Sequence, residues 1–428
     1  MNKWFIGLLF IASTSFFIYQ HSTGYSWDFS VYYMNSRYFL AGSGFYEWGR
    51  PPLASFLMFF GEYSYIILVS ILGLLACLKF SKVYKLRPEV FYAFILTPYT
   101  IMTGFSVGTE YLVLSLTLLF FAFLKSELSG FFLGLTTLAH YSSAINGLFL
   151  FFSGKKFFKA LILVVLVNLP WFLFNYVVAG DPFYSFLNQY ALDITMRRDY
   201  IVTQPQLTHF LLVASFTIPF FIFGLFKFDK KFEIDWLMLL FFGLRLFSYF
   251  FIPLKEARYL FMILLPVAYF STKGLKRFNY RVAFVVVILT LFFCSNYYYL
   301  LEDSGKYFRV KELINDSCMV MSNSWVFLNY FGVSSAPSVR AELVNESISK
   351  GYTIILFKHI WDPTYVFNDS FITQFPIVHN TSEFYVINDE SVCLQPFTYN
   401  KSFIQEVNNT FVKLFNETFS FTIWDVIS

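Results

Sequence analysis

The sequence predicts an α-helical membrane protein with many spans, followed by a small C-terminal α/β domain outside the cytoplasm. Of the 428 residues, 57% are hydrophobic and only 14% are charged, whereas soluble domains carry about 25% charged residues. Long apolar runs recur through the first 300 residues and then shorten. We therefore expect a membrane domain over residues 1–300 and an extracytoplasmic domain over residues 301–428.

The remaining composition agrees with a membrane location. Aromatic residues make up 23% of the chain, which suits lipid-facing surfaces and the belts of Tyr and Trp at membrane interfaces. The net charge of +4 is spread over short loops. No basic stripe is present, and this argues against a nucleic-acid partner.

Lysine and arginine clusters predict how the chain crosses the membrane. The first run, Trp4–Tyr19, is followed by no small-residue cleavage site, so we expect a retained span that enters from the cytoplasm. The basic cluster at residues 79–87 marks the cytoplasmic side of the second span. Further crossings are expected over Pro88–Phe105 and Pro205–Phe226. In total we expect about eleven membrane segments in a multi-pass protein of the cell membrane, with a cytoplasmic N-terminus.

The segment Gly130–Ser153 is predicted to be a hairpin of two short helices. It carries small and polar residues in its middle and has lysines on both flanks, at Lys125 and at residues 155–159. If both flanks are cytoplasmic, the segment must turn back within the membrane. Broken helices are tolerated there when they are buried in protein or line a cavity.

The C-terminal part carries seven N-x-S/T acceptor triplets, whereas residues 1–300 carry none. This distribution predicts a glycoprotein and agrees with an extracytoplasmic tail. The acceptors are Asn315, Asn345, Asn368, Asn380, Asn400, Asn408 and Asn416.

Short apolar runs in the tail predict its secondary structure. We expect strands over Cys318–Ser322 and Tyr352–Phe357, helices over Trp325–Tyr330 and Val339–Lys350, and a hairpin that pairs Phe384–Ile387 with Ser391–Leu394.

Four cysteines are present. Cys77 and Cys294 lie in apolar runs, as packing residues do. Cys318 and Cys393 lie in the tail, where an oxidising environment permits one disulfide between them. Two separate thiols are the alternative.

Charged residues gather on the predicted outer face from loops far apart in sequence. Asp28 follows the first span, Glu47 and Arg50 precede the second, Glu110 begins a later one, and Lys255 and Arg258 share a short turn. A further cation, Arg245, lies inside a span, where a charge is costly unless it is used.

This combination suits transfer of a sugar from a polyprenyl phosphate. The phosphate is already a good leaving group and needs positive charge as it departs, which Arg258, Lys255, Arg50 and Arg245 would supply. The acceptor hydroxyl needs a carboxylate to take its proton, and Asp28 fits that role. Glu47 and Glu110 are candidates for binding the acceptor or a metal.

Simpler roles remain open for the same residues. Asp28 is also suited to capping the helix that follows it. Lys255 and Arg258 are suited to anchoring their turn to lipid phosphates, Arg50 to an ordinary loop, and Glu47 and Glu110 to the surface. The sequence identifies no certain cofactor, and a divalent metal ion stays open, although no cluster has the spacing of a metal site.

At these residues the chain resembles the GT-C superfamily, in the branch of protein O-mannosyltransferases and bacterial aminoarabinose transferases. The similar motifs are Asp28 after the first span, Arg50-Pro51-Pro52-Leu53, Gly180-Asp181-Pro182-Phe183-Tyr184 and Lys255-Glu256-Ala257-Arg258-Tyr259-Leu260. The resemblance covers about residues 1–300. It implies a GT-C fold and an inverting hexosyl transfer from a dolichyl-type lipid phosphate, with Asp28 as the catalytic residue and Arg258 on the carrier phosphate.

The departures from the family pattern concern the subfamily. Mannosyltransferases usually show Asp-Glu where this chain has Asp28-Phe29. The tail lacks the Trp-Trp-Asp-Tyr-Gly motif of oligosaccharyltransferases, which argues against transfer of a whole glycan.

The predicted partners are therefore the lipid bilayer, a polyprenyl-phosphate sugar, and a protein, lipid or glycan acceptor. The glycosylation triplets and short lysine-rich loops would suit protein glycosylation at an archaeal membrane. The alternatives are a lipid or small-solute transporter or flippase, whose site would lie between repeated halves, and a non-catalytic scaffold. No internal repeat is evident.

Overall fold

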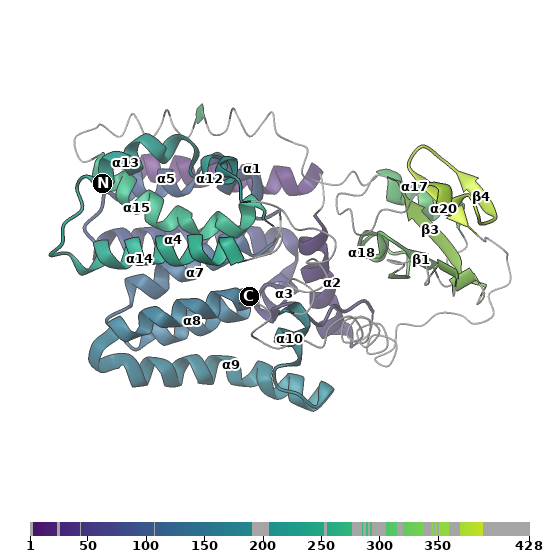
Figure 1. Ribbon diagram of the computed structural model, residues 1–428, viewed down its shortest axis with the longest axis horizontal. Helices are drawn as coiled ribbons and strands as arrows, with labels where there is room; N and C mark the ends of the chain where they lie inside the picture. The colour runs from purple at the N-terminus through teal and green to yellow at the C-terminus, as the bar shows by residue number, and fades with distance from the viewer. Residues whose placement is uncertain are drawn as a thin grey trace. The chain divides into compact units, whose positions relative to one another are not determined.

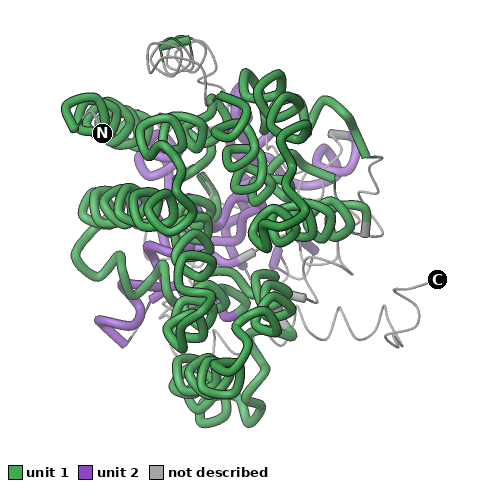
Figure 2. Tube along the Cα trace, turned by 90° about the vertical axis from the view of Figure 1, so that its left-hand side faces the viewer, with its two compact units in different colours: residues 1–29, 49–301 green, residues 30–48, 302–428 purple. Residues whose placement is uncertain are grey.

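The computed structural model divides the chain into two compact units, which Figure 2 shows in different colours. Unit 1 comprises residues 1–29 and 49–301, and unit 2 comprises residues 30–48 and 302–428. The described residues are 3–23, 26–42, 44–106, 108–190, 205–251, 255–275, 285, 288–289, 292, 305–314, 320–337, 344–345, 347–348, 351–358 and 369–387.

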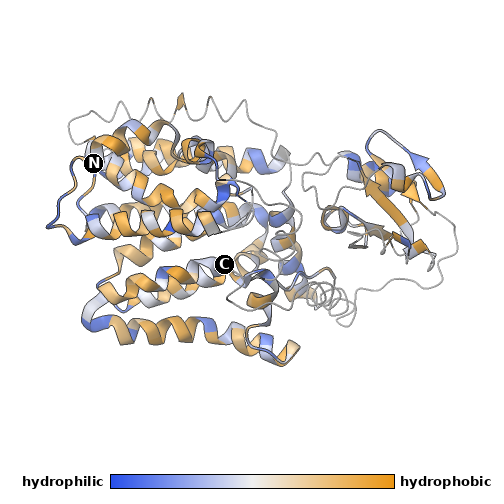
Figure 3. Ribbon diagram, in the orientation of Figure 1, coloured by the Kyte–Doolittle hydropathy of each residue, from blue (hydrophilic) through white to orange (hydrophobic). Residues whose placement is uncertain are grey.

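Unit 1 is helical and strongly apolar. Four of its described helical stretches are long and apolar enough to cross a membrane, namely Lys3–Ser22, Glu62–Val83, Tyr141–Ala179 and Leu207–Leu225. Figure 3 shows apolar residues along most of the helices in this unit. The predicted helical membrane domain is therefore confirmed.

The helices of unit 1 are labelled in Figure 1, and all of their described bounds follow in chain order. They are α1 (Lys3–Thr23), the start of α2 (Trp27–Ala41), α3 (Pro52–Leu57), η1 (Met58–Phe60), α4 (Glu62–Val83), α5 (Pro88–Ile95), α6 (Pro98–Thr103), α7 (Glu110–Ala122), α8 (Leu128–Ala139), η2 (Tyr141–Lys156), α9 (Phe157–Ala179), α10 (Tyr184–Tyr190), α12 (Leu207–Ala214), η4 (Ser215–Thr217), α13 (Ile218–Leu225), α14 (Glu233–Phe251), η5 (Ala257–Ile263) and α15 (Leu264–Gly274).

Two expected crossings are broken into shorter helices. Pro88–Phe105 contains α5 and α6, because Pro98 opens a new helix and the Thr97 hydroxyl caps it by accepting a hydrogen bond from the Thr100 N–H. Pro205–Phe226 is interrupted at Ser215, whose φ of 46° departs from helical backbone. These segments are therefore not the continuous helices that their apolar runs suggest.

The predicted hairpin at residues 130–153 is present as α8 and η2. The two helices meet at His140, which has extended backbone, and Gly154 interrupts η2 near its end with a φ of 61°. α8 also packs closely along α9 (Figure 1), since a Cβ atom at Gly130 would lie 1.8 Å from the Ala160 carbonyl oxygen.

Unit 2 contains a five-stranded mixed sheet in the order β2-β1-β3-β5-β4. The strands are β1 (Val320–Ser322), β2 (Ser335–Pro337), β3 (Thr353–Phe357), β4 (Ile377–Asn380) and β5 (Phe384–Ile387), with helices α17 (Gly305–Leu313), α18 (Trp325–Tyr330) and α20 (Asp369–Ile372). β1 is parallel to β2 and β3, whereas β5 is antiparallel to β3 and β4. The small C-terminal α/β fold is thus as predicted.

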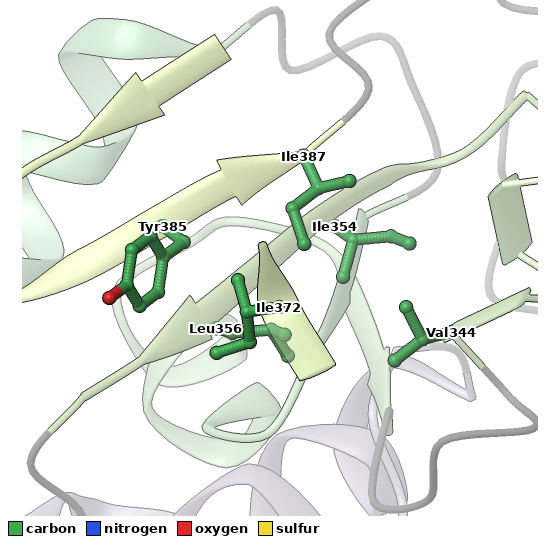
Figure 4. Packing of buried hydrophobic residues seen from close by; sticks show 6 residues of the cluster. All are labelled: Val344, Ile354, Leu356, Ile372, Tyr385 and Ile387. Carbon is green, nitrogen blue, oxygen red and sulfur yellow. The ribbon is translucent and has the colours of Figure 1, made fainter. Parts of the chain in front are cut away.

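One hydrophobic cluster of this unit packs against one face of the sheet, whose central strands β3 and β5 are buried on both faces. Figure 4 shows Ile354 and Leu356 of β3 beside Tyr385 and Ile387 of β5, with Ile372 of α20 packed against them. Burial of these side chains explains why the apolar runs in the tail mark strands.

The expected pairing of Phe384–Ile387 with Ser391–Leu394 is wrong. β5 lies between β3 and β4, so both of its edges are already paired, and its hairpin partner is Ile377–Asn380. The side chains of β4 alternate between half-buried and exposed, so this strand was not recognised from the sequence. Ser391–Leu394 lies outside the described residues.

Two glycosylation acceptors can be located. Asn345 and Asn380 are both exposed, as an acceptor must be. The other five acceptors and both cysteines of the predicted disulfide, Cys318 and Cys393, lie outside the described residues, and so does most of the expected helix Val339–Lys350.

Candidate active site

Asp28 lies in the first turn of α2 and holds two guanidinium groups. Arg50 Nη2 is 2.7 Å from Asp28 Oδ1, and Arg258 Nη1 donates to Asp28 Oδ2 at 3.0 Å. The helix begins one residue earlier, and the Ser26 hydroxyl accepts the Phe29 N–H at 3.3 Å. The capping role therefore belongs to Ser26.

Aromatic packing fixes the start of α2 against its neighbours in unit 1. The Phe29 ring lies 4.3 Å from the His21 ring and 6.0 Å from the Tyr65 ring, measured between centroids. His21 Nε2 is in turn 3.1 Å from Glu62 Oε2, at the start of α4. This packing restrains the helical turn that carries Asp28.

Arg258, the second residue of η5, is shared between two acids. Its Nε lies 2.5 Å from Glu256 Oε2, and its guanidinium carbon lies 5.2 Å from the centre of the Tyr259 ring. Arg50 is placed by the turn before α3, where Pro51 and Pro52 restrict the backbone. We call Asp28, Arg50, Glu256 and Arg258 the Asp28 cluster.

Two further predicted residues lie near this cluster in unit 1. The Glu110 carboxylate, at the first residue of α7, is attracted by Arg258 and repelled by Asp28. Lys255 is 9% exposed, and its burial lowers the pKa of the ammonium group. Tyr99 of α6 is buried within electrostatic range of Glu110 and Arg258.

The other two predicted residues have different surroundings. Glu47 belongs to unit 2, where its backbone N–H and carbonyl bond the side chain of Asn35 at 2.9 and 3.0 Å. Arg245 is buried in α14, and its Nη2 donates to Asn146 Oδ1 at 2.5 Å. Arg245 therefore forms a pair with Asn146 of η2.

The described residues give no arrangement that suits a metal ion. Within the described ranges, no group of three or more His, Cys, Asp or Glu side chains has the geometry of a metal site. The possible metal-binding roles of Glu47 and Glu110 stay predictions.

The Asp28 cluster can exchange partners with an anionic ligand. Asp28, Arg50, Glu256 and Arg258 are each 15–18% exposed, so they are accessible although largely buried. A phosphate group offers the same paired oxygens as a carboxylate, and guanidinium groups bind both in a forked geometry. A phosphate on Arg258 would release Asp28 Oδ2 from Arg258 while Arg50 still holds Oδ1, so that Oδ2 could accept a proton.

The sequence reasoning missed the part played by Glu256 and Tyr99. Glu256 lies within the Lys255–Leu260 motif, so its position two residues before Arg258 was a usable signal. Tyr99 carried no signal, because it is one of 30 tyrosines and approaches the cluster only through the fold.

Comparison with known proteins places the fold. No protein-family model matches the chain, and no curated protein matches it in sequence. Its structure is similar to the crystal structure of ArnT from Cupriavidus metallidurans bound to undecaprenyl phosphate, with a TM-score of 0.66 and 10% sequence identity over 93% of this chain and 100% of that chain. The resemblance inferred from the motifs is thus confirmed at the level of the fold: the chain is a membrane protein with the GT-C fold.

Proposed function

We propose that this protein is a membrane glycosyltransferase that moves a sugar from a polyprenyl phosphate to an acceptor hydroxyl. The observation that carries the proposal is the Asp28 carboxylate held between Arg50 and Arg258 at 2.7 and 3.0 Å. It combines a proton acceptor with two phosphate-binding groups in one place. The similar fold of ArnT, whose crystal structure contains undecaprenyl phosphate, supports a lipid-phosphate donor.

In the proposed reaction, the carrier phosphate binds Arg258, and Arg50 and Lys255 add positive charge. The acceptor oxygen attacks the anomeric carbon while Asp28 takes the proton of the hydroxyl. The bond between the anomeric carbon and the phosphate oxygen breaks, and the carrier leaves as a phosphate monoester. Attack from the face opposite the phosphate inverts the anomeric configuration.

Glu256 would control the position of Arg258 during this exchange. Its carboxylate contacts the Nε edge of the guanidinium, whereas Asp28 contacts Nη1. Replacing Asp28 by a phosphate therefore needs no loss of the contact with Glu256. The guanidinium stays oriented because one of its edges remains held.

The kinds of carrier, sugar, acceptor and membrane are also part of the proposal. We propose a dolichyl-type carrier, a hexosyl group as in mannosyltransferases, a protein acceptor as in protein glycosylation, and an archaeal membrane. The site would face the extracytoplasmic side, as basic loop clusters and the glycosylation triplets predict. We propose Glu110 for binding the acceptor or a metal ion, and the same role for Glu47 stays a prediction from the sequence.

The test is to incubate purified protein with labelled dolichyl-phosphate sugars and candidate protein, lipid and glycan acceptors. The proposal predicts that the label moves to an acceptor with inverted anomeric configuration, and that one free dolichyl phosphate appears per sugar transferred. Failure of any lipid-linked sugar to be consumed with any acceptor would refute it. Movement of the intact labelled lipid between leaflets, without cleavage, would instead indicate a flippase.

A further inference from the structure

A buried pair, Arg245 and Asn146, lies inside the helical unit apart from the Asp28 cluster. Arg245 belongs to α14 and is 6% exposed, and Asn146 belongs to η2 and is fully buried. Arg245 Nη2 donates to Asn146 Oδ1 at 2.5 Å, and the guanidinium carbon lies 5.2 Å from the centre of the Phe241 ring. The pair therefore joins two helices through residues that are 99 positions apart in sequence.

Polar hydrogens of this pair are left without acceptors. Arg245 Nε and Asn146 Nδ2 are both buried, and neither has a hydrogen-bond partner among the described residues. No carboxylate of the described ranges lies within 4 Å of the Arg245 guanidinium. Buried charges in proteins are ordinarily paired, and buried donors are ordinarily bonded.

Both residues lie below the ends of their helices. Arg245 is six residues before Phe251, or roughly 9 Å along an α-helix. Asn146 is five residues after Tyr141, or roughly 10 Å along a 3₁₀ helix. Tyr141 is fixed in place by Trp171 Nε1, which donates to its hydroxyl at 2.8 Å. The pair thus lies about two turns inside the apolar bundle.

The donors of this pair match an oxyanion. A guanidinium group and a side-chain amide together offer several N–H groups directed to oxygen, and the positive charge favours an anion. Both a lipid phosphate and a free phosphate must shed water to enter an apolar bundle, which is costly. Burial of the lipid's apolar chain offsets this cost, whereas a free ion has no such compensation. A lipid-borne phosphate therefore fits the site better than free phosphate.

We propose that Arg245 and Asn146 form a second phosphate-binding site, which takes the phosphate group of a polyprenyl phosphate. The identity of this lipid rests on the function proposed above. The site is distinct from the Asp28 cluster, since Arg245 bonds Asn146 and Arg258 bonds Asp28. It would hold the carrier phosphate when the carrier is not engaged by Arg258.

The test compares thermal unfolding of variants in detergent with polyprenyl phosphate or inorganic phosphate as the probe. A ligand that binds the folded state raises Tm, and the stabilisation grows with the logarithm of 1 + L/Kd, where L is the ligand concentration, so weaker binding gives a smaller shift at the same concentration. We expect polyprenyl phosphate, and not inorganic phosphate, to raise the Tm of the unmodified protein. Lipid binding of the variants at this pair is compared in an Arg258→Met background, where the Asp28 cluster no longer binds the lipid. Asn146→Asp supplies an internal carboxylate to Arg245, so it should raise Tm without lipid and weaken lipid binding at least tenfold.

Two further variants complete the design. Arg245→Met should also weaken lipid binding at least tenfold, and it should do so in protein that remains folded. Asn168→Asp is the matched control, because Asn168 is a buried asparagine of α9 whose Nδ2 donates to the Val164 carbonyl at 2.8 Å. This control should retain the lipid-induced shift.

Three outcomes would overturn the inference. They are no shift with polyprenyl phosphate in the unmodified protein, a shift in Asn146→Asp and Arg245→Met as large as in the protein with both residues intact, or a shift with inorganic phosphate as large as that with polyprenyl phosphate. Arg258→Met separates the two proposals, because it should abolish transfer while retaining the shift that depends on Arg245. If no sugar is transferred at all but the Arg245-dependent shift is present, the second site stands and the proposed function fails.

Discussion

The helices η5 and α15 follow each other directly, and together we call them the rod. Two ion-pair clusters lie at its two ends, and they differ in accessibility and in how their partners are shared. At one end, Arg258 belongs to the Asp28 cluster. At the other end, roughly 26 Å away by helical rise, Lys273 bonds Asp235, the third residue of α14. The same helical rod therefore carries a charged cluster at each end.

The cluster at Asp235 is closed. The Asp235 side chain is fully buried, and it accepts hydrogen bonds from the Tyr269 hydroxyl, the Lys273 ammonium and, at 2.8 Å, the Asp229 N–H. Each of these donors comes from the protein, and they connect α14, α15 and the preceding turn. Such a cluster is suited to holding helices together.

The cluster at Asp28 is accessible and its partners are shared. Arg258 is divided between Asp28 and Glu256, and Asp28 between Arg258 and Arg50, with 15–18% of each side chain exposed. A ligand can replace one of these contacts and leave the others in place. The contrast teaches that accessibility and shared partners, more than the number of charges, distinguish a cluster that is suited to binding a ligand from one that is suited to holding helices together.

The largest expected effect is that of Asp28→Asn on sugar transfer. Loss of a general base typically slows a reaction by 10²–10⁴-fold, so we expect kcat to fall by about 10³-fold while carrier binding persists. Single-turnover transfer from a labelled polyprenyl-phosphate sugar measures this effect. A rate within threefold of the unmodified protein would remove Asp28 from the reaction.

At the closed cluster, Asp235→Asn should act on stability instead. It leaves Lys273 partly buried without its counter-charge, and breaking a buried pair costs about 3 kcal/mol. Thermal unfolding in detergent should show the loss, whereas kcat per folded molecule should be unchanged. Glu233→Gln is the control, because its pair with Lys125 is exposed and contributes at most about 1 kcal/mol. Equal losses in both variants would contradict the distinction.

A smaller effect is expected from Arg258→Lys. The substitution retains the charge but removes the forked donors that bridge Asp28 and Glu256. We expect kcat/KM for the lipid donor to fall about 10²-fold, comparable to loss of one donor from an oxyanion site. Steady-state kinetics at varied donor concentration give the value. An unchanged kcat/KM would show that only the charge of Arg258 matters.

The smallest expected effect is on the pH dependence of donor affinity, through Lys255. Because burial lowers the pKa of its ammonium group, Lys255 loses its positive charge at a lower pH than an exposed lysine does. Donor affinity should therefore decline on the alkaline side of the pH profile. Lys255→Arg should move this decline to higher pH, since arginine stays protonated. The same alkaline profile in both proteins would exclude Lys255 from donor binding.

Several residues of the candidate site could be predicted from the sequence, because they are charged residues next to apolar runs. Asp28, Arg50 and Arg258 stand out there, and the order of their motifs pointed to a common site. The ion pair between Asp28 and Arg258 could not be predicted, since the two residues are 230 positions apart in sequence. The contact between Asn146 and Arg245 could not be predicted either, because nothing in the sequence distinguishes this asparagine from other polar residues in the apolar run.

The fold shows the same division between local and long-range information. Trp325–Tyr330 was predicted with the bounds that α18 has, because a short apolar run between turns decides it locally. The partner of β5 was predicted wrongly, since strand pairing depends on contacts across the sheet. Pro98 in the first turn of α6 marks the break before that helix, and Pro219 in the first turn of α13 marks the break at Ser215 in the same way.

The most direct test of the account is photo-crosslinking with a polyprenyl phosphate that carries a photoreactive group beside the phosphate. Labelled peptides would be mapped by mass spectrometry, with excess polyprenyl phosphate as competitor. The account predicts competed labelling of the peptides that contain Trp27–Phe29 and Lys255–Tyr259. Labelling confined to the Asp235 and Lys273 end of the rod, or labelling that the competitor does not reduce, would contradict it.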